Sequence, residues 1–121
     1  MARILVIDDD DQIRAMLGQV LKREGHEVAQ APDGNVGMRL FREQGADLII
    51  TDIVMPEKEG IETIIELRNN FPEVKIIAMS GGGRMNADEY LALAKSLGVK
   101  ATLTKPFELK ELLAAVQALL E

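Results

Sequence analysis

Residues 4–11 read ILVIDDDD: four apolar residues without polar alternation run directly into four aspartates. Such a run is typical of a strand that is buried on both faces, as in a parallel sheet with helices on either side. Three later apolar runs also end in a residue with a charged or hydroxyl group: residues 48–51 in Asp52, residues 76–79 in Ser80, and residues 101–104 in Lys105. Because parallel strands end at one edge of their sheet, we expect these side chains to converge there.

The segments between these runs carry apolar residues at helical spacing, and the alternation of run and helix repeats five times along the chain. The first helix has Asp11 as a candidate N-cap and Gly25 as its stop signal. Asp10 and Asp11 are together expected to serve this helix as cap and as N-terminal charges favoured by its dipole. This order predicts an α/β protein with one five-stranded parallel sheet, strand order 2-1-3-4-5, and helices on both faces. In this flavodoxin-like arrangement the ligand crevice lies beside the first and third strands, which end in Asp8, Asp9 and Asp52.

The composition is that of an ordinary soluble globular domain. With 121 residues, 47% hydrophobic and 28% charged, residues 1–121 are expected to form one domain with a single core. The chain has no cysteine, which excludes disulfides and thiolate metal sites and fits a cytoplasmic location. We expect no membrane partner, because no segment has the length of a membrane span and no signal-peptide pattern is present. A net charge of −6, with one tyrosine and three phenylalanines, argues against direct nucleic acid binding.

Carboxylates gathered at one sheet edge repel each other. Two unit charges about 4 Å apart cost on the order of 4 kcal/mol at an effective dielectric near 20. A divalent cation would remove this cost, and hard oxygen ligands suit Mg²⁺. A run of aspartates is also typical of a solvated helix start, but its position after an apolar strand, together with Asp52, favours a magnesium site.

Four motifs, each at the end of its predicted strand, closely resemble the receiver domain of two-component response regulators. They are IDD at residues 7–9, DIVMP at residues 52–56 with Gly60, Ser80, and KPF at residues 105–107. The resemblance covers essentially the whole chain and implies the flavodoxin-like receiver fold. It also implies that Asp52 accepts a phosphoryl group from a sensor histidine kinase or a histidine phosphotransfer protein.

Further roles follow from the same resemblance. Mg²⁺ would be held by Asp8, Asp9, Asp52 and the backbone carbonyl of Val54. Lys105 would pair with the phosphoryl oxygens, Ser80 would donate a hydrogen bond to one of them, and the bond between Lys105 and Pro106 would be cis. The chemistry agrees, because phosphoryl transfer depends mainly on positioning and charge neutralisation.

On this interpretation the chain is a phosphorylatable switch that acts on an unknown output protein or a fused output domain. It is not an enzyme with turnover, because it catalyses only its own phosphorylation and dephosphorylation. Two alternatives remain: a non-phosphorylated pseudo-receiver that serves as an interaction module, and a small aspartate-based phosphatase. The phosphatases usually place a second acid two residues after the nucleophile, where this chain has Val54. A pseudo-receiver would lack an acid or the lysine.

The chain departs from the family pattern at the position three residues before Lys105. An aromatic switch residue is usual there, and this chain has Thr102. The segment at residues 81–88 is also longer than in common receivers, so Tyr90 becomes a candidate to repack on switching. By the same resemblance a kinase is expected to contact the first helix and the loop after the fifth strand. On the helix three residues recur beside the apolar stripe, Arg14, Gly18 and Lys22, and the loop carries Pro106 and Phe107.

Overall fold

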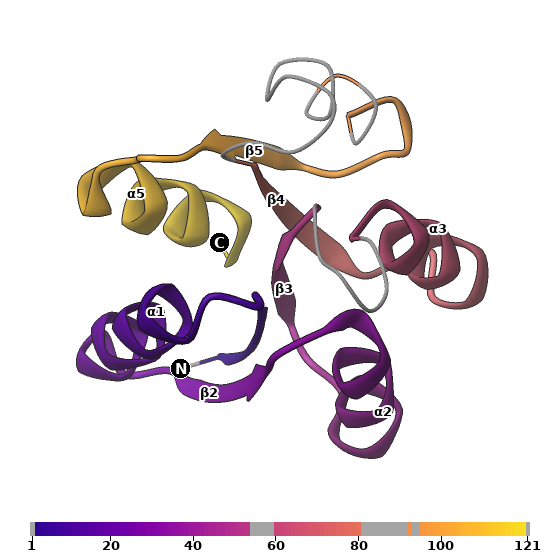
Figure 1. Ribbon diagram of the computed structural model, residues 1–121, viewed down its shortest axis with the longest axis horizontal. Helices are drawn as coiled ribbons and strands as arrows, with labels where there is room; N and C mark the ends of the chain where they lie inside the picture. Colours follow the sequence, from indigo (N-terminus) through magenta and orange to yellow (C-terminus); the bar gives the residue numbers. More distant parts are fainter. Residues whose placement is uncertain (1, 54–59, 81–91, 93–94, 121) are drawn as a thin grey trace.

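The computed structural model describes residues 2–53, 60–80, 92 and 95–120. Strands and helices alternate along the chain (Figure 1). Their bounds are β1 (Arg3–Ile7), α1 (Asp11–Arg23), β2 (Glu27–Ala31), α2 (Gly34–Gln44), β3 (Leu48–Asp52), α3 (Gly60–Asn70), β4 (Lys75–Ser80), β5 (Ala101–Thr104) and α5 (Leu109–Leu120).

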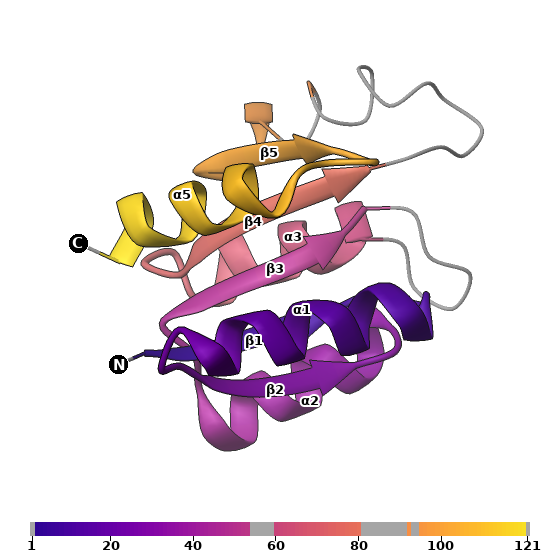
Figure 2. The same ribbon diagram turned by 90° about the vertical axis from the view of Figure 1, so that its left-hand side faces the viewer.

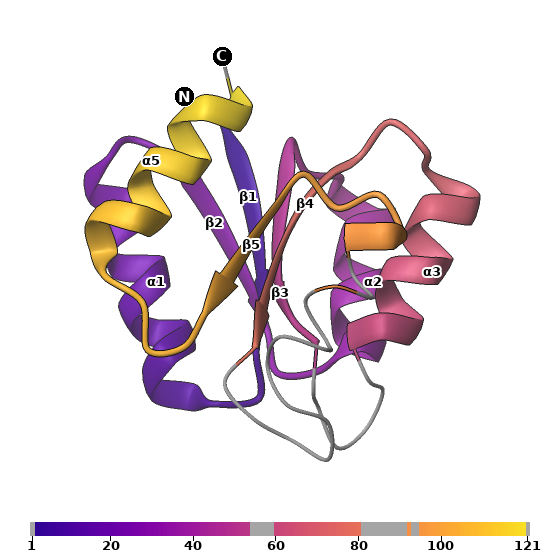
Figure 3. The same ribbon diagram turned by 90° about the horizontal axis from the view of Figure 1, so that it is seen from above.

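The strands form one sheet in the order β2-β1-β3-β4-β5, and every neighbouring pair is parallel. Figure 3 shows α1 and α5 on one face of the sheet and α2 and α3 on the other. This arrangement confirms the predicted α/β fold, its strand order and its two helical layers.

The core has two halves, one on each face of the sheet. Along β1 the side chains alternate between them: Leu5 and Ile7 belong to the half that includes Ile64 of α3, and Ile4 and Val6 to the other. All four of these side chains are buried, so the strand needs apolar side chains on both faces. This two-sided burial explains the absence of polar alternation in the sequence. None of the helices in the described segments is long and apolar enough to cross a bilayer.

The first helix begins differently from the prediction. Its N-cap is Asp10, whose carboxylate accepts hydrogen bonds from Gln12 N at 2.9 Å and Ile13 N at 3.1 Å. Asp11 is instead the first helical residue, where a negative charge interacts favourably with the helix dipole. Asp10 and Asp11 thus serve the helix start as cap and N-terminal charge, as predicted. The prediction of Asp11 itself as the N-cap was wrong by one residue, because the residue with extended backbone before the first turn is Asp10. After the helix Gly25 adopts a φ of 91°, a conformation that favours glycine.

Candidate functional site

The predicted strand-end residues lie at one edge of the sheet, because all neighbouring strands are parallel and their carboxyl ends share that edge. Figure 2 shows β2, β3, β4 and β5 pointing toward it. The registers that align the strand ends are Ile7 to Thr51, Asp52 to Met79, and Ser80 to Thr104. Beyond this ladder, Lys105 N donates to Ser80 O at 2.8 Å and fixes the start of the segment that carries the lysine. Asp8, Asp52, Ser80 and Lys105 therefore come from four different strand ends to one edge. The bond between Lys105 and Pro106 is cis, as the resemblance implied.

Lys105 connects two of the acids directly. Its Nζ donates to Asp8 Oδ2 at 2.9 Å and to Asp52 Oδ2 at 3.0 Å. The lysine side chain is 16% exposed, and those of Asp8 and Asp52 are 0% and 9% exposed. Burial by itself lowers the pKa of Lys105, but its hydrogen bonds to Asp8 and Asp52 and the negative charges of both acids outweigh that effect, so the pKa is raised above its ordinary value. The lysine is therefore held as an ammonium between two carboxylates.

A third carboxylate completes an oxygen-rich cluster. One carboxylate oxygen from each of Asp8, Asp9 and Asp52 lies within 4.8 Å of the others. Asp9 is exposed while Asp8 and Asp52 are buried, so the cluster has one side open to solvent. Three hard oxygen donors with an open side match what Mg²⁺ requires, because this ion keeps several of its waters and uses few carboxylates. Val54, predicted as a further ligand through its carbonyl, lies outside the described residues.

Ser80 is fully buried, and within the described part of the structure its Oγ has no hydrogen-bond partner. A buried hydroxyl without a partner typically costs about 1–3 kcal/mol. Such groups are rare in folded proteins and point to a bound water or ion or to a functional role. At the end of β4, on the same edge as the acids, this hydroxyl is available to an acceptor that enters the site.

The residues expected to face a kinase along α1 differ from one another. Lys22 is exposed, but it lies in the last turn of the helix, roughly 16 Å of helix rise from Asp11. Gly18 is buried, and a Cβ added there would lie 2.4 Å from Nε2 of Gln30. Arg14 has only 16% of its side chain exposed. Of the three docking positions predicted on α1, Gly18 and most of the Arg14 side chain are therefore buried.

Other predicted residues lie apart from the acids or outside the described segments. Thr102 lies on β5, is half-buried, and pairs with Ala78 of β4. Tyr90 and residues 81–88 lie outside the described part of the chain.

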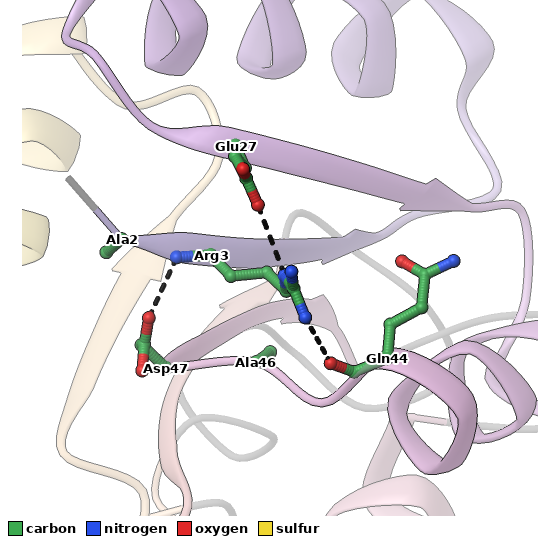
Figure 4. A pocket seen from close by; sticks show the side chains of 6 residues that line it. All are labelled: Ala2, Arg3, Glu27, Gln44, Ala46 and Asp47. Carbon is green, nitrogen blue, oxygen red and sulfur yellow. Dashed lines mark hydrogen bonds and ion pairs between the residues drawn. The ribbon is translucent and has the colours of Figure 1, made fainter.

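A hollow of about 340 Å³ lies at the opposite edge of the sheet (Figure 4). It is lined by Ala2, Arg3, Glu27, Gln44, Ala46 and Asp47. Its polar groups bind one another: the Arg3 guanidinium lies 3.3 Å from Glu27 Oε2 and donates to Gln44 O, and Arg3 N donates to Asp47 Oδ2 at 2.8 Å. These contacts connect the starts of β1, β2 and β3. The polar residues that line the hollow therefore have a structural role.

The comparisons with known proteins all indicate the same family. The model of the response regulator receiver domain matches residues 4–117. The DNA-binding transcriptional regulator NtrC of Azospirillum brasilense is 40% identical over 116 residues, which are 96% of this chain and 24% of that protein. The transcriptional regulatory protein CpxR of Klebsiella pneumoniae is 36% identical over 120 residues, which are 99% of this chain and 50% of that protein. The chain thus spans half or less of the length of these relatives.

A solved structure gives the same result in three dimensions. The response regulator protein TrrA from Thermotoga maritima, crystallised in complex with Mg(2+)-BeF, superposes with a TM-score of 0.83 and 32% identity over 98% of this chain and 99% of that one. Proteins of this family are signalling switches and in general not classical enzymes. With a family match over nearly its whole length and a fold shared with a solved response regulator, the chain belongs to the receiver domains of two-component response regulators.

Proposed function

We propose that residues 1–121 form a receiver domain that takes a phosphoryl group onto Asp52 from a sensor histidine kinase or a histidine phosphotransfer protein. The phosphorylated form then has a changed affinity for an output partner. The observation that carries this proposal is the position of Lys105 Nζ, which lies 2.9 Å from Asp8 and 3.0 Å from Asp52 in a site with a third acid nearby. A charge arrangement of this kind is suited to phosphoryl transfer, which depends on positioning and neutralisation.

The transfer is a substitution at phosphorus. An oxygen of the Asp52 carboxylate forms the new bond as the bond from phosphorus to the donor nitrogen breaks, and the donor leaves with that electron pair. Lys105 keeps the attacking group ionised and offsets negative charge on the phosphoryl oxygens. Ser80 would donate its hydroxyl hydrogen to one of those oxygens, which would give this buried group the partner it lacks.

Asp8, Asp9 and Asp52 would hold Mg²⁺, with the backbone carbonyl of Val54 as a further ligand. When bound, Mg²⁺ supplies positive charge beside the oxygens of the transferring group. The crystal structure of TrrA was obtained with Mg(2+)-BeF, which supports the same chemistry for this related chain.

The alternatives are less well supported. A pseudo-receiver would lack an acid or the lysine, yet Asp8, Asp9, Asp52 and Lys105 are all present. A phosphatase would require a second acid at position 54, which is valine. Water attack on the aspartyl phosphate returns the carboxylate and phosphate, so the modification is reversible without a second substrate.

The relatives extend well beyond the matched region, and their names describe DNA-binding and transcriptional regulators. We propose that this chain acts on an output domain fused to it or on a separate output protein. With a net charge of −6, residues 1–121 would make no direct contact with DNA, and any such contact would belong to that output. A cytoplasmic location follows from the proposed kinase partner.

The test is phosphorylation by a small donor. Acetyl phosphate and Mg²⁺ should add one phosphoryl group to the wild type, read by intact mass, and none to Asp52→Asn. Asp47→Asn is a matched control, because it makes the same chemical change at an exposed acid at the opposite edge. Equal phosphorylation of wild type and Asp52→Asn would contradict the assignment of the acceptor.

A further inference from the structure

Every polar atom of Asp8 has a partner. Asp8 N donates to Ala31 O at 3.1 Å, and Asp10 N donates to Asp8 Oδ1 at 2.9 Å. Lys105 Nζ donates to Asp8 Oδ2 at 2.9 Å, and Arg14 Nη1 donates to Asp8 O at 2.7 Å. Three of these partners come from the ends of β2 and β5 and from the turn itself. The fourth is a long side chain from α1 that reaches back to the turn.

The environment of Arg14 distinguishes it from a surface arginine. A second guanidinium nitrogen, Nη2, forms an ion pair with Asp11, and the side chain is 16% exposed. Arg14 is the fourth residue of α1, where the helix dipole disfavours a cation. Ordering an arginine side chain also costs about 2 kcal/mol of rotamer entropy. These costs are offset by two charge-assisted hydrogen bonds, which the planar guanidinium makes in a fixed geometry.

We infer that Arg14 is a positioning residue for the metal-binding pair Asp8 and Asp9; the inference rests on the proposed function. The carbonyl that Arg14 holds belongs to the peptide unit between these two residues. A peptide unit is planar, so fixing its oxygen fixes the direction in which the Asp9 backbone continues. Arg14 therefore sets the orientation of one acid relative to the other, although it touches neither carboxylate.

A purely electrostatic role for Arg14 makes the opposite prediction. The guanidinium is a positive charge beside a cation site, and like charges repel. Replacing Arg14 with a neutral residue would therefore tighten Mg²⁺ binding if charge alone mattered. If Arg14 positions the pair, the same replacement weakens binding, because the two acids lose their fixed relative orientation. The direction in which the Mg²⁺ affinity changes therefore distinguishes a positioning role from a purely electrostatic one.

The experiment is a titration of the folded protein with Mg²⁺ alone, followed by backbone amide chemical shifts. Arg14→Met should raise the dissociation constant about tenfold, the usual scale for residues that support metal ligands. Arg14→Lys should recover most of the affinity, because an ammonium can still donate to the Asp8 carbonyl. Arg23→Met is the matched control: it removes a cation from an exposed position in the last turn of the same helix and should leave the affinity unchanged.

A second readout follows phosphorylation by acetyl phosphate as a function of Mg²⁺ concentration. Arg14→Met should need about ten times more Mg²⁺ for half-maximal rate and approach the wild-type rate at saturation. If this variant does not fold, Arg14→Gln repeats both measurements. Unchanged or tighter Mg²⁺ binding by the neutral variants would overturn the inference. Because the titration requires no phosphorylation, a wild type that binds Mg²⁺ but takes up no phosphoryl group would refute the proposed function alone.

Discussion

The ammonium of Lys105 and the carboxylate of Asp8 form an ion pair of 2.9 Å in which the aspartate side chain has no exposed surface. Lys105 makes a second ion pair of 3.0 Å with Asp52. One cation thus offsets the repulsion between two buried carboxylates. Removing one partner of a buried ion pair leaves an uncompensated charge, which typically costs about 3–5 kcal/mol. Lys105 therefore stabilises the fold without any bound ligand.

Lys105→Met should lower the free energy of unfolding by roughly 3 kcal/mol in metal-free buffer, because Asp8 and Asp52 lose their shared cation. Mg²⁺ should recover part of the loss, since a ligand that binds only the folded state stabilises it by mass action. Urea denaturation with EDTA and with Mg²⁺ measures both effects. Lys100→Met, at an exposed lysine, is the control, and an equal effect of the two substitutions would show that the ion pairs contribute nothing.

The contribution of Lys105 should depend on pH in a defined direction. Its pKa is raised in the folded protein, so its stabilising effect is complete below the pKa of an unfolded lysine, about 10.4. The effect is lost as the pH rises through the folded-state pKa. The difference in unfolding free energy between wild type and Lys105→Met should therefore stay constant near neutral pH and narrow above about pH 10.4. If this difference in unfolding free energy instead narrows on acidification from pH 8 to pH 6, the pH dependence belongs to a group other than Lys105.

The same substitution, aspartate to asparagine, should change the stability of the metal-free protein in opposite directions at Asp8 and at Asp9. Asp9→Asn removes an exposed charge from the cluster and should raise the melting temperature without metal, because repulsion falls. Asp8→Asn removes one of the two carboxylate partners of Lys105 and should cost roughly 1–3 kcal/mol. Both should weaken Mg²⁺ binding. Thermal denaturation in EDTA measures the melting temperatures of both variants and of the wild type without metal. A clear fall in melting temperature for Asp9→Asn would refute the repulsion between the acids.

Ser80→Ala should slow phosphorylation without lowering the stability of the fold. The variant removes a buried hydroxyl that has no partner among the described residues, so the free energy of unfolding should be unchanged or rise by up to about 1 kcal/mol. Phosphorylation by acetyl phosphate should slow, because a donor to the phosphoryl oxygens is lost. Denaturation curves and intact mass measure the two effects. A loss of stability larger than 1 kcal/mol would mean that the hydroxyl already makes a hydrogen bond in the resting protein.

The strands and their ends were predictable from sequence because both depend on local pattern. Residues 4–7 are apolar without alternation since the two halves of the core lie on opposite faces of β1. Once the strands are parallel, their polar end residues must share one edge, so Asp8, Asp52, Ser80 and Lys105 could be named as neighbours.

Features that depend on single dihedral angles or on side-chain direction could not be predicted. The N-cap is Asp10 and not Asp11 because the backbone of Asp10 is extended, which a run of identical residues does not reveal. Arg14 is a charged residue near a helix start, between Ile13 and Ala15, and arginines are mostly exposed in folded proteins. Only the folded turn places the Asp8 carbonyl within its reach. The spacing of Asp11 and Arg14, three residues apart on a helix, predicts their ion pair but not the hydrogen bond to Asp8.

The lysine of this site also determines when the site can exist during protein synthesis. Lys105 is separated from Asp8 by 97 positions and from Asp52 by 53. A ribosome releases the N-terminus first, so both acids emerge well before their cation, and the nascent sheet lacks β5 until residues 101–104 have been made. A chain that is still being translated, or one that is cut before β5, would hold its acids without the ammonium between them. The paired charges at the carboxyl ends of β1 and β3 therefore form only after β5 has been synthesised.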